Sequence, residues 1–233
     1  MSLRLDWVDY KAALYACEHW HYSKRLSKAA NNYIGVWEEG KFIGCIVFGI
    51  GATNNIGRPY NLTNQECIEL TRVALANHKT PVTQIIKIAL KLLKKKNPGL
   101  KLIVSYADSE QDHYGGIYQA GNWIYTGFSQ DDNIVVNGIR EHRRTLGSRY
   151  GTNSLEWIRK HVDPSAKRVH TQPKFKYLYP LTDDMRLKIE PLRKPYPKKS
   201  ALVVHPVRTS GDQPGEGGSI PTPTHRETKQ VSE

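Results

Sequence analysis

The hydrophobic pattern of the chain first predicts strands. Tyr33–Glu38 and Lys41–Gly49 are rich in β-branched and aromatic residues, and Glu39-Gly40 between them is a two-residue hairpin signal. Lys41–Gly49 is apolar on both faces, which indicates a central strand of a covered sheet. Cys67–Leu75 has the same β-forming composition, so a third strand is predicted there.

Helical spacing follows the third predicted strand. The clearest predicted helix runs from Pro81 to Lys96, with Thr80 as its expected cap. Its apolar face is formed by Val82, Ile85, Ile86, Ala89 and Leu93. Another helix is predicted near the amino terminus, capped by Asp6 and with Trp7 and Val8 on its apolar face.

Three more elements are predicted after the Pro81–Lys96 helix. They are a buried strand at Leu100–Tyr106, a short helix at Gly115–Asn122 and a strand at Trp123–Phe128. The order of strands and helices indicates an α/β fold, in which helices flank a central sheet. Thr209–Glu233 contains too few bulky aliphatic residues to offset the entropy of ordering, so a disordered tail is expected.

The charge of the chain is concentrated in one segment. The 233 residues carry a net charge of +12, and residues 140–199 hold 16 basic and 6 acidic side chains against 15 and 12 in residues 1–139. A concentrated excess favours a polyanionic partner such as nucleic acid, although a basic surface that serves solubility is the alternative. We expect a core over 1–139, a basic segment over 140–199 that completes the domain and contacts the polyanion, and a tail over 200–233.

Two classes of protein are disfavoured. The longest weakly polar run, Ile43–Ala52, has about half of the ~20 residues that a membrane-spanning helix needs. The cysteines Cys17, Cys45 and Cys67 are far apart and form no Cys-x-x-Cys pair, which argues against a disulfide framework and against a cysteine zinc site. We expect a cytoplasmic protein whose cysteines fill the core.

Polar groups with useful chemistry follow the predicted Leu100–Tyr106 strand. Ser105, Asp108 and His113 lie where α/β proteins build their sites, at the carboxyl end of a strand. Asp108 and His113 suit acid-base catalysis or metal ligation, and a solvated loop is the alternative. His19 and His21 precede the first predicted strand, and their spacing does not place both on one helical face, which disfavours a helical histidine-pair metal site.

Two further groups of residues suit phosphate binding. The first turn of the Pro81–Lys96 helix offers free N–H donors and a partial positive charge, although an ordinary helix start is the alternative. This group contains Arg72, Thr80, Val82, Thr83 and Gln84. The other group lies in the basic segment and consists of Arg140, His142, Arg143, Arg144, Arg149, Lys174 and Lys176.

The order of elements, together with Ile117–Gly127, resembles the GCN5-related N-acetyltransferase fold. The resemblance implies a mixed central sheet with a basic C-terminal extension, and acetyl-CoA whose pyrophosphate lies at the start of the helix after the fourth strand. The pantetheine then enters a splay between the next two strands. Tyr118 matches the tyrosine that protonates the departing thiolate, and Tyr114 is the alternative. The glycine-containing phosphate loop of that fold is not matched by His78–Thr83.

Several short blocks, in the same order, resemble the Mom family of phage DNA-modification proteins. The blocks are His21–Ser23, Gly44–Gly49, Glu69–Val73, Ser105–Asp108, Gly116–Ala120 and Lys176–Leu181. The resemblance implies that acetyl-CoA is used to convert N6 of adenine in double-stranded DNA to an acetamido or methylcarbamoyl form, which protects phage DNA from host restriction. It also implies bound iron, for which the matching ligands are His21, Tyr22, Asp108 and Tyr118.

A mechanism follows from this resemblance. Asp108, aided by His21 or His113, accepts a proton from the adenine amine, and Tyr118 protonates the thiolate of CoA. The adenine is expected to flip out of the duplex, with Tyr22 and Tyr106 as its stacking partners. The alternatives are an acetyltransferase of the same fold that acts on a protein or a small amine, and a DNA-binding protein without catalytic activity.

Overall fold

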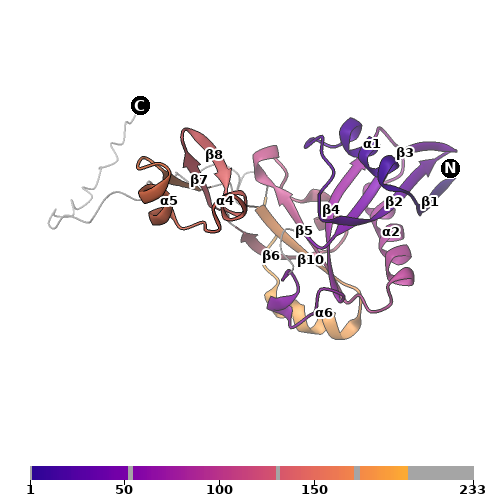
Figure 1. The fold of residues 1–233 in the computed structure, drawn as a ribbon. Helices are drawn as coiled ribbons and strands as arrows, with labels where there is room; N and C mark the ends of the chain where they lie inside the picture. Colours follow the sequence, from indigo (N-terminus) through magenta and orange to yellow (C-terminus); the bar gives the residue numbers. More distant parts are fainter. Residues whose placement is uncertain (1, 52–54, 130–131, 171–173, 199–233) are drawn as a thin grey trace, which may run out of the picture. The chain divides into compact units, whose positions relative to one another are not determined.

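The computed structural model describes residues 2–51, 55–129, 132–170 and 174–198 (Figure 1). The expected tail at 200–233 lies outside these ranges, as does the side chain of Arg144. Within them, seven strands form the large sheet in the order β1-β2-β3-β4-β5-β10-β6. Their bounds are β1 Leu3–Trp7, β2 Ala30–Glu38, β3 Lys41–Gly49, β4 Cys67–Leu75, β5 Leu102–Asp108, β6 Ile124–Ser129 and β10 Lys174–Pro180.

The large sheet is mixed, as the sequence predicts. Only the β4–β5 pairing is parallel, and the neighbouring strands in the rest of this sheet are antiparallel. The parallel pairing joins Cys67–Leu70 to Leu102–Ser105 and ends there, while both strands continue for several residues. The two strands therefore separate after Leu70 and Ser105, which is the kind of splay expected from the resemblance to acetyltransferases.

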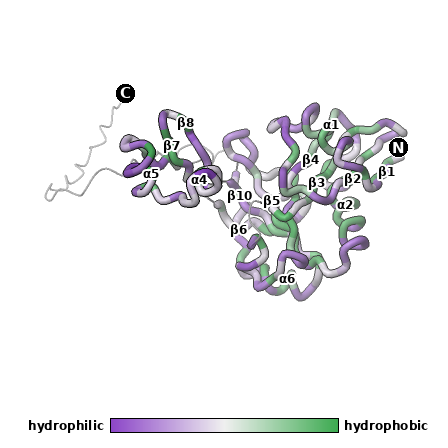
Figure 2. Tube along the Cα trace, in the orientation of Figure 1, coloured by the Kyte–Doolittle hydropathy of each residue, from purple (hydrophilic) through white to green (hydrophobic). Residues whose placement is uncertain are grey.

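Helices cover both faces of the large sheet. They are α1 Tyr10–Trp20, α2 Val82–Lys96, α3 Gly116–Ala120 and α6 Asp183–Ile189. The buried side chains of α2 and Tyr118 of α3 belong to one cluster with alternate residues of the strands, such as Ile46 and Ile103. The side chains of α1 and α6 contact the opposite face, where they join Cys45 and Leu102 in two other clusters. Figure 2 shows hydrophobic residues concentrated in the central strands.

The start of the chain differs from the predicted helix. Residues 3–7 form β1, in which Asp6 pairs with Gly35, and the helix begins only at Tyr10. Asp9 caps this helix, since its carboxylate accepts a hydrogen bond from the Ala12 N–H at 2.9 Å. The predicted cap at Asp6 is therefore wrong. Leu3, Leu5 and Trp7 alternate with polar residues and pack against the core.

The predicted cap of α2 is also wrong. Pro81 occupies the cap position, and no side chain caps this helix. Thr80 instead binds Glu38 at the end of β2: its backbone N–H and its hydroxyl donate to Glu38 Oε1 at 2.8 and 2.5 Å. The Lys79 N–H donates to Glu38 Oε2 at 2.9 Å. These hydrogen bonds hold the pKa of Glu38 at about 2, so a carboxylate fixes the turn before α2.

A small sheet with its own core lies between β6 and β10 in sequence. Its strands are β7 Asp132–Val136, β8 Ile139–His142 and β9 Lys167–His170, and it is accompanied by α4 Arg143–Tyr150 and α5 Leu155–His161. A separate cluster of buried residues joins its strands to both helices, among them Ile134, Leu146 and Ile158. The expected division at 139/140 lies at the start of β8. The basic segment returns to the large sheet through β10, between β5 and β6.

The cysteines are core residues, as expected. Cys17, Cys45 and Cys67 are free and buried, and burial raises the pKa of each thiol to about 11 or 12. In the described ranges, no helix is long and apolar enough to cross a bilayer.

Candidate active site

Ser105 and Tyr118 meet where β4 and β5 separate. The Ser105 hydroxyl lies 2.8 Å from Leu70 O and 2.8 Å from the Tyr118 hydroxyl, and both side chains are buried. A carbonyl oxygen can only accept, so the Ser105 hydroxyl donates its single proton to Leu70 O. The Tyr118 hydroxyl then donates to the Ser105 oxygen. Burial raises the pKa of Tyr118 to about 12, although the hydrogen bond with Ser105 lowers it. Tyr118 therefore carries its proton at neutral pH.

A second group of side chains lies at the carboxyl end of β5. The Tyr22 hydroxyl donates to Asp108 Oδ2 at 3.4 Å, and the ring centroids of Tyr22 and His113 are 5.4 Å apart. Lys174 Nζ, on the adjacent β10, is 4.0 Å from the same carboxylate oxygen. The Glu110 N–H donates to Asp108 Oδ1 at 3.1 Å, which fixes the carboxylate. The order of residues placed Asp108 and His113 together, and the family resemblance added Tyr22, which the structure brings to Asp108 from a distant loop.

His21 is buried beside this group. Its ring centroid is 4.3 Å from that of Tyr22, and its Nδ1 accepts a hydrogen bond from the Ser23 N–H at 3.1 Å. Since Nδ1 is an acceptor, the proton of the neutral ring lies on Nε2. Burial, followed by the positive charges of Arg72, His113 and Lys24, lowers the pKa of His21 to about 4. His21 is therefore a neutral hydrogen-bond donor at its free nitrogen.

The proposed iron ligands do not fit this geometry. The Tyr118 hydroxyl is bonded to Ser105 inside the core, and the free nitrogen of His21 carries a proton. Among the residues that the structure describes, no three His, Cys, Asp or Glu side chains gather as a metal site. The set of His21, Tyr22, Asp108 and Tyr118 thus gains no support as iron ligands from the structure.

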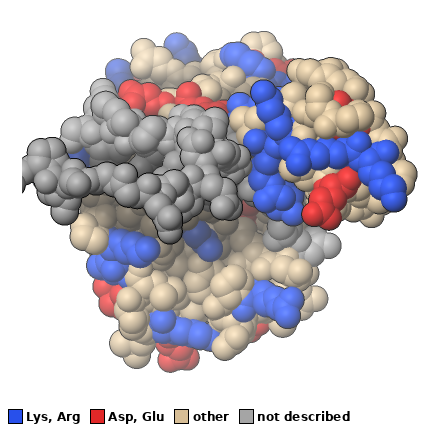
Figure 3. All heavy atoms as spheres, turned by 90° about the vertical axis from the view of Figure 1, so that its left-hand side faces the viewer, with Lys and Arg blue, Asp and Glu red and all other residues tan. Residues whose placement is uncertain are grey.

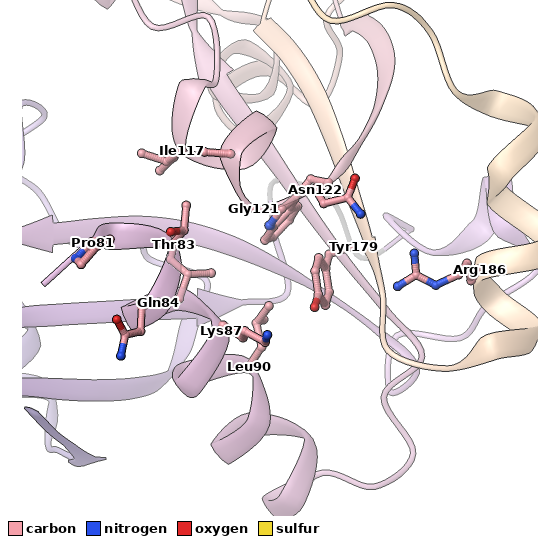
Figure 4. A pocket seen from close by; sticks show the side chains of 13 residues that line it. Pro81, Thr83, Gln84, Lys87, Leu90, Ile117, Gly121, Asn122, Tyr179 and Arg186 are labelled. Atoms are coloured by element: carbon pink, nitrogen blue, oxygen red, sulfur yellow. The ribbon is translucent and has the colours of Figure 1, made fainter.

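A cavity of about 580 Å³ lies between α2 and α3 (Figure 4). Of the residues expected to bind phosphate, Thr83 and Gln84 of the first turn of α2 line it, whereas Arg72, Thr80 and Val82 are not among its lining residues. Its volume is in the range of small-molecule sites. On α3, Ile117 lines the cavity and its neighbour Tyr118 bonds to Ser105, so the cavity and the Ser105–Tyr118 pair share one short helix.

The structure places Arg72 away from this cavity. Its guanidinium donates to Arg25 O at 3.2 Å and to Thr71 O at 2.6 Å. Its charge lowers the pKa of both His21 and Tyr22, whereas burial raises that of Tyr22 to about 12. Arg72 therefore belongs with His21 and Tyr22, on the part of β4 that has separated from β5.

Sequence reasoning missed several residues that line the cavity. They are Lys87, Leu90, Asn122, Trp123, Tyr179 and Arg186. Lys87 lies one turn after Thr83 on the same face of α2, so the i, i+4 spacing could have identified it. Arg186 on α6 has no comparable local signal, since α6 is about 90 residues further along the chain and reaches the cavity only through packing.

The basic residues expected to bind DNA divide into two groups. Some have partners of their own: Arg149 pairs with Glu141 at 2.6 Å, Arg143 donates to Asn153 at 3.2 Å, and the ammonium of Lys176 lies 5.1 Å from the centre of the Tyr60 ring. His142 ends β8 and is half-buried.

The other group faces the candidate site. Arg140 lies 3.6 Å from Glu110, and Lys174 lies 4.0 Å from Asp108. Both side chains remain about half exposed. Figure 3 shows Lys and Arg side chains gathered in a band on one face of the molecule. Arg140 and Lys174 are therefore cations of the basic segment that lie next to the end of β5 and the turn after it.

Known proteins resemble this chain in sequence and in structure. The model of the Mom protein family matches residues 2–198. The methylcarbamoylase Mom of Escherichia phage Mu is 24% identical over 205 residues, which are 84% of each chain. A probable acetyltransferase of Staphylococcus epidermidis has a TM-score of 0.43 and 8% identity, and covers 78% of this chain and 100% of its own. An IAA acetyltransferase of Bacillus cereus has a TM-score of 0.38 and 13% identity, over 77% and 100%.

The match to the family model extends from β1 to the end of the described residues and includes both groups of the candidate site. The block around His21 lies far from the blocks around Ser105 and Tyr118 in the sequence, and the three meet in this site. By this match, the chain belongs to the Mom protein family.

Proposed function

We propose that the protein uses acetyl-CoA to modify N6 of adenine in double-stranded DNA, giving an acetamido or methylcarbamoyl form that protects phage DNA from host restriction. One observation carries the proposal. A buried, protonated Tyr118 lies where β4 and β5 separate, and the pair of Asp108 and Tyr22 lies at the carboxyl end of β5. The name of the phage Mu relative, a methylcarbamoylase, supports group transfer.

The proposed reaction needs two proton transfers, one from the adenine amine and one to the thiolate of CoA. The exocyclic amine of adenine is a weak nucleophile because its lone pair is delocalised into the ring, so it needs a nearby proton acceptor. Bound acetyl-CoA supplies the activated acyl group and a thiolate leaving group. In this step an N6–acyl bond would form as the C–S bond of the thioester breaks, with Asp108 accepting the amine proton and Tyr118 donating its proton to the thiolate. Ser105 then turns its hydroxyl toward the tyrosinate, since it lies 2.8 Å from that oxygen. The step gives an N6-acetyl group. The acetamido and methylcarbamoyl forms contain one more nitrogen, which the acetyl group does not supply.

The groups around Asp108 fit a flipped base. Within a duplex the adenine amine is paired and its base is stacked, so the base must leave the helix, which costs roughly a few kcal/mol. Tyr22 is 46% exposed and its hydroxyl is fixed by Asp108, which offers an aromatic face next to the proton acceptor. His113 packs edge-on against this ring and holds its orientation. His21 supports the ring of Tyr22 from its buried position.

We assign acetyl-CoA to the cavity between α2 and α3. It has mixed lining, with Lys87 and Arg186 as cations and Ile117 and Leu90 as apolar residues. The separation of β4 and β5 provides the route by which the acyl end reaches Tyr118.

Mass spectrometry of nucleosides tests the proposed reaction. DNA from cells that express the protein is expected to contain a modified deoxyadenosine of increased mass, and DNA from cells without it only deoxyadenosine. Incubation of the purified protein with acetyl-CoA and DNA is expected to release free thiol. Unmodified deoxyadenosine in every sample contradicts the proposal, and thiol release with a protein or small amine in place of DNA indicates the alternative acetyltransferase.

The affinity for DNA is expected to depend steeply on salt. If Arg140 and Lys174 each neutralise a phosphate, the double variant R140Q/K174Q lowers the slope of log K against log salt by about 2. Fluorescence anisotropy with a labelled duplex measures this slope. The variant K91Q/K95Q removes the same charge from exposed positions on α2 and is the control. An equal change in both variants means that total charge, and not contact, decides the affinity.

A further inference from the structure

The cavity between α2 and α3 brings together two cations from distant parts of the chain. Lys87 lies on α2 and Arg186 on α6, and both line the cavity. Figure 4 shows the guanidinium of Arg186 reaching from α6 toward Tyr179. A pair of cations that converges on one small cavity favours an anionic ligand.

The same cavity has an aromatic wall. Trp123 and Tyr179 line it, and their ring centroids are 5.2 Å apart. The Tyr196 hydroxyl donates to Trp123 O at 2.6 Å, which holds this wall in place. Trp123 is 1% exposed, so the half-buried ring of Tyr179 is the one that a ligand can contact. An aromatic ring beside cations suits a phosphorylated nucleoside, because the base contacts the ring and the phosphates contact the cations.

The turn before α2 does not offer its own N–H groups to a phosphate. The N–H groups of Lys79 and Thr80 donate to the Glu38 carboxylate, and Pro81 has no N–H. The N–H groups of Gln84 and Ile85 donate to Pro81 O at 2.9 and 3.3 Å. The fixed negative charge of Glu38 also repels a phosphate from this turn. Lys87 and Arg186 are the cations among the residues that line the cavity, so their side chains offer the positive charge that this turn does not.

The acidic residue near Arg186 is paired mainly with another arginine, so Arg186 is available for a ligand. Glu190 is the acidic residue whose pKa responds to Arg186, but its main partner is Arg193, at 2.5 Å. Both Lys87 and Arg186 are exposed, so each side chain can turn toward an anion in the cavity.

We propose that Lys87 and Arg186 hold the phosphates of the nucleotide half of acetyl-CoA, with Tyr179 beside its adenine. The inference rests on the proposed use of acetyl-CoA, whose phosphate-binding side chains it names. It also assigns one cation of the basic segment, Arg186, to the cofactor and not to DNA.

Isothermal titration calorimetry of the full chain tests this inference with three probes: CoA, adenosine 3′,5′-bisphosphate and acetyl-pantetheine, which has no phosphate. The variant K87Q/R186Q is expected to bind the first two roughly tenfold more weakly than the unchanged protein. Its affinity for acetyl-pantetheine and for DNA is expected to stay the same. The control K91Q/K95Q, with the same loss of charge, is expected to bind every probe normally.

Three results overturn the inference: unchanged affinity of K87Q/R186Q for CoA, an equal loss for acetyl-pantetheine, or an equal loss in K91Q/K95Q. These results leave the proposed function standing, since the unchanged protein still binds CoA. Failure of the unchanged protein to bind CoA overturns the proposed use of acetyl-CoA itself, and this inference with it. Circular dichroism of each variant shows whether the fold is retained.

Discussion

Replacement of Tyr118 by Phe is expected to lower the turnover of acetyl-CoA and DNA by about 100-fold or more, which is the usual loss when a general acid is removed. The variant removes only the hydroxyl that lies 2.8 Å from Ser105 and keeps the ring in the core. Without this proton donor, the thiolate of CoA must leave unprotonated. Single-turnover thiol release measures the rate of this step directly.

The affinity of Tyr118→Phe for its substrates separates chemistry from binding. Tyr118 does not line the cavity between α2 and α3, so the dissociation constant of CoA is expected to stay within about twofold. The ring still contacts Trp123 and Tyr177, whose centroids are 5.0 and 5.1 Å away, so the fold is expected to be retained.

Tyr114→Phe is the matched control for Tyr118→Phe. Tyr114 is the other tyrosine that the sequence offers as proton donor, four residues earlier. The structure holds it through its backbone carbonyl, which accepts hydrogen bonds from Tyr177 at 2.6 Å and Gln119 at 3.1 Å. Removal of the Tyr114 hydroxyl leaves these bonds in place, so near-normal turnover is expected. Normal turnover in Tyr118→Phe with a large loss in Tyr114→Phe would mean that Tyr114, and not Tyr118, is the proton donor.

The parts of the fold with long, uniform patterns were predictable. The predicted strands at Lys41–Gly49 and Cys67–Leu75 have the observed bounds, and the helix at Pro81–Lys96 begins one residue later. In these elements the apolar spacing extends over nine or more residues, so local pattern and tertiary burial agree. The sequence pattern is therefore sufficient where one face is buried along its whole length.

Short elements depended on tertiary pairing. The five residues of β1 precede a helix, and both Asp6 and Asp9 are good caps, so the local signals for the helix start were equal. Pairing of β1 with β2 decides between them. The β7–β8 hairpin carried a clear signal that was overlooked: Asn137-Gly138, with φ of 50° and 77°, joins the two strands.

The candidate site shows the same contrast. Ser105, Asp108 and Tyr118 lie on consecutive elements around the end of one buried strand, so sequence order alone brings them together. Tyr22 reaches Asp108 across 86 positions of the chain, and Arg186 reaches the cavity from α6. Such contacts arise from the packing of the whole sheet, which no local spacing records. The resemblance to a family, and not periodicity, pointed to Tyr22.

Asp108→Asn is expected to lower the rate of the chemical step by about 100-fold, because the amide cannot accept the proton of the adenine amine. The neutral side chain keeps an oxygen for the Glu110 N–H, so the end of β5 stays fixed. Loss of the negative charge also frees Lys174, which lies 4.0 Å away, for a phosphate. DNA affinity is therefore expected to be equal or higher in this variant, while turnover falls.

Asp112→Asn provides the control for this prediction, since it makes the same change of charge four residues further along the loop. Asp112 has a φ of 55°, a conformation that Asn adopts readily, so its fold is expected to be retained. If Asp108 acts only through its charge near DNA, both variants raise DNA affinity and neither loses turnover. If Asp108 accepts the proton, only Asp108→Asn loses thiol release in a single turnover at saturating DNA and acetyl-CoA. Because saturation removes the effect of affinity on the rate, the comparison isolates the proton acceptor from the electrostatic field around it.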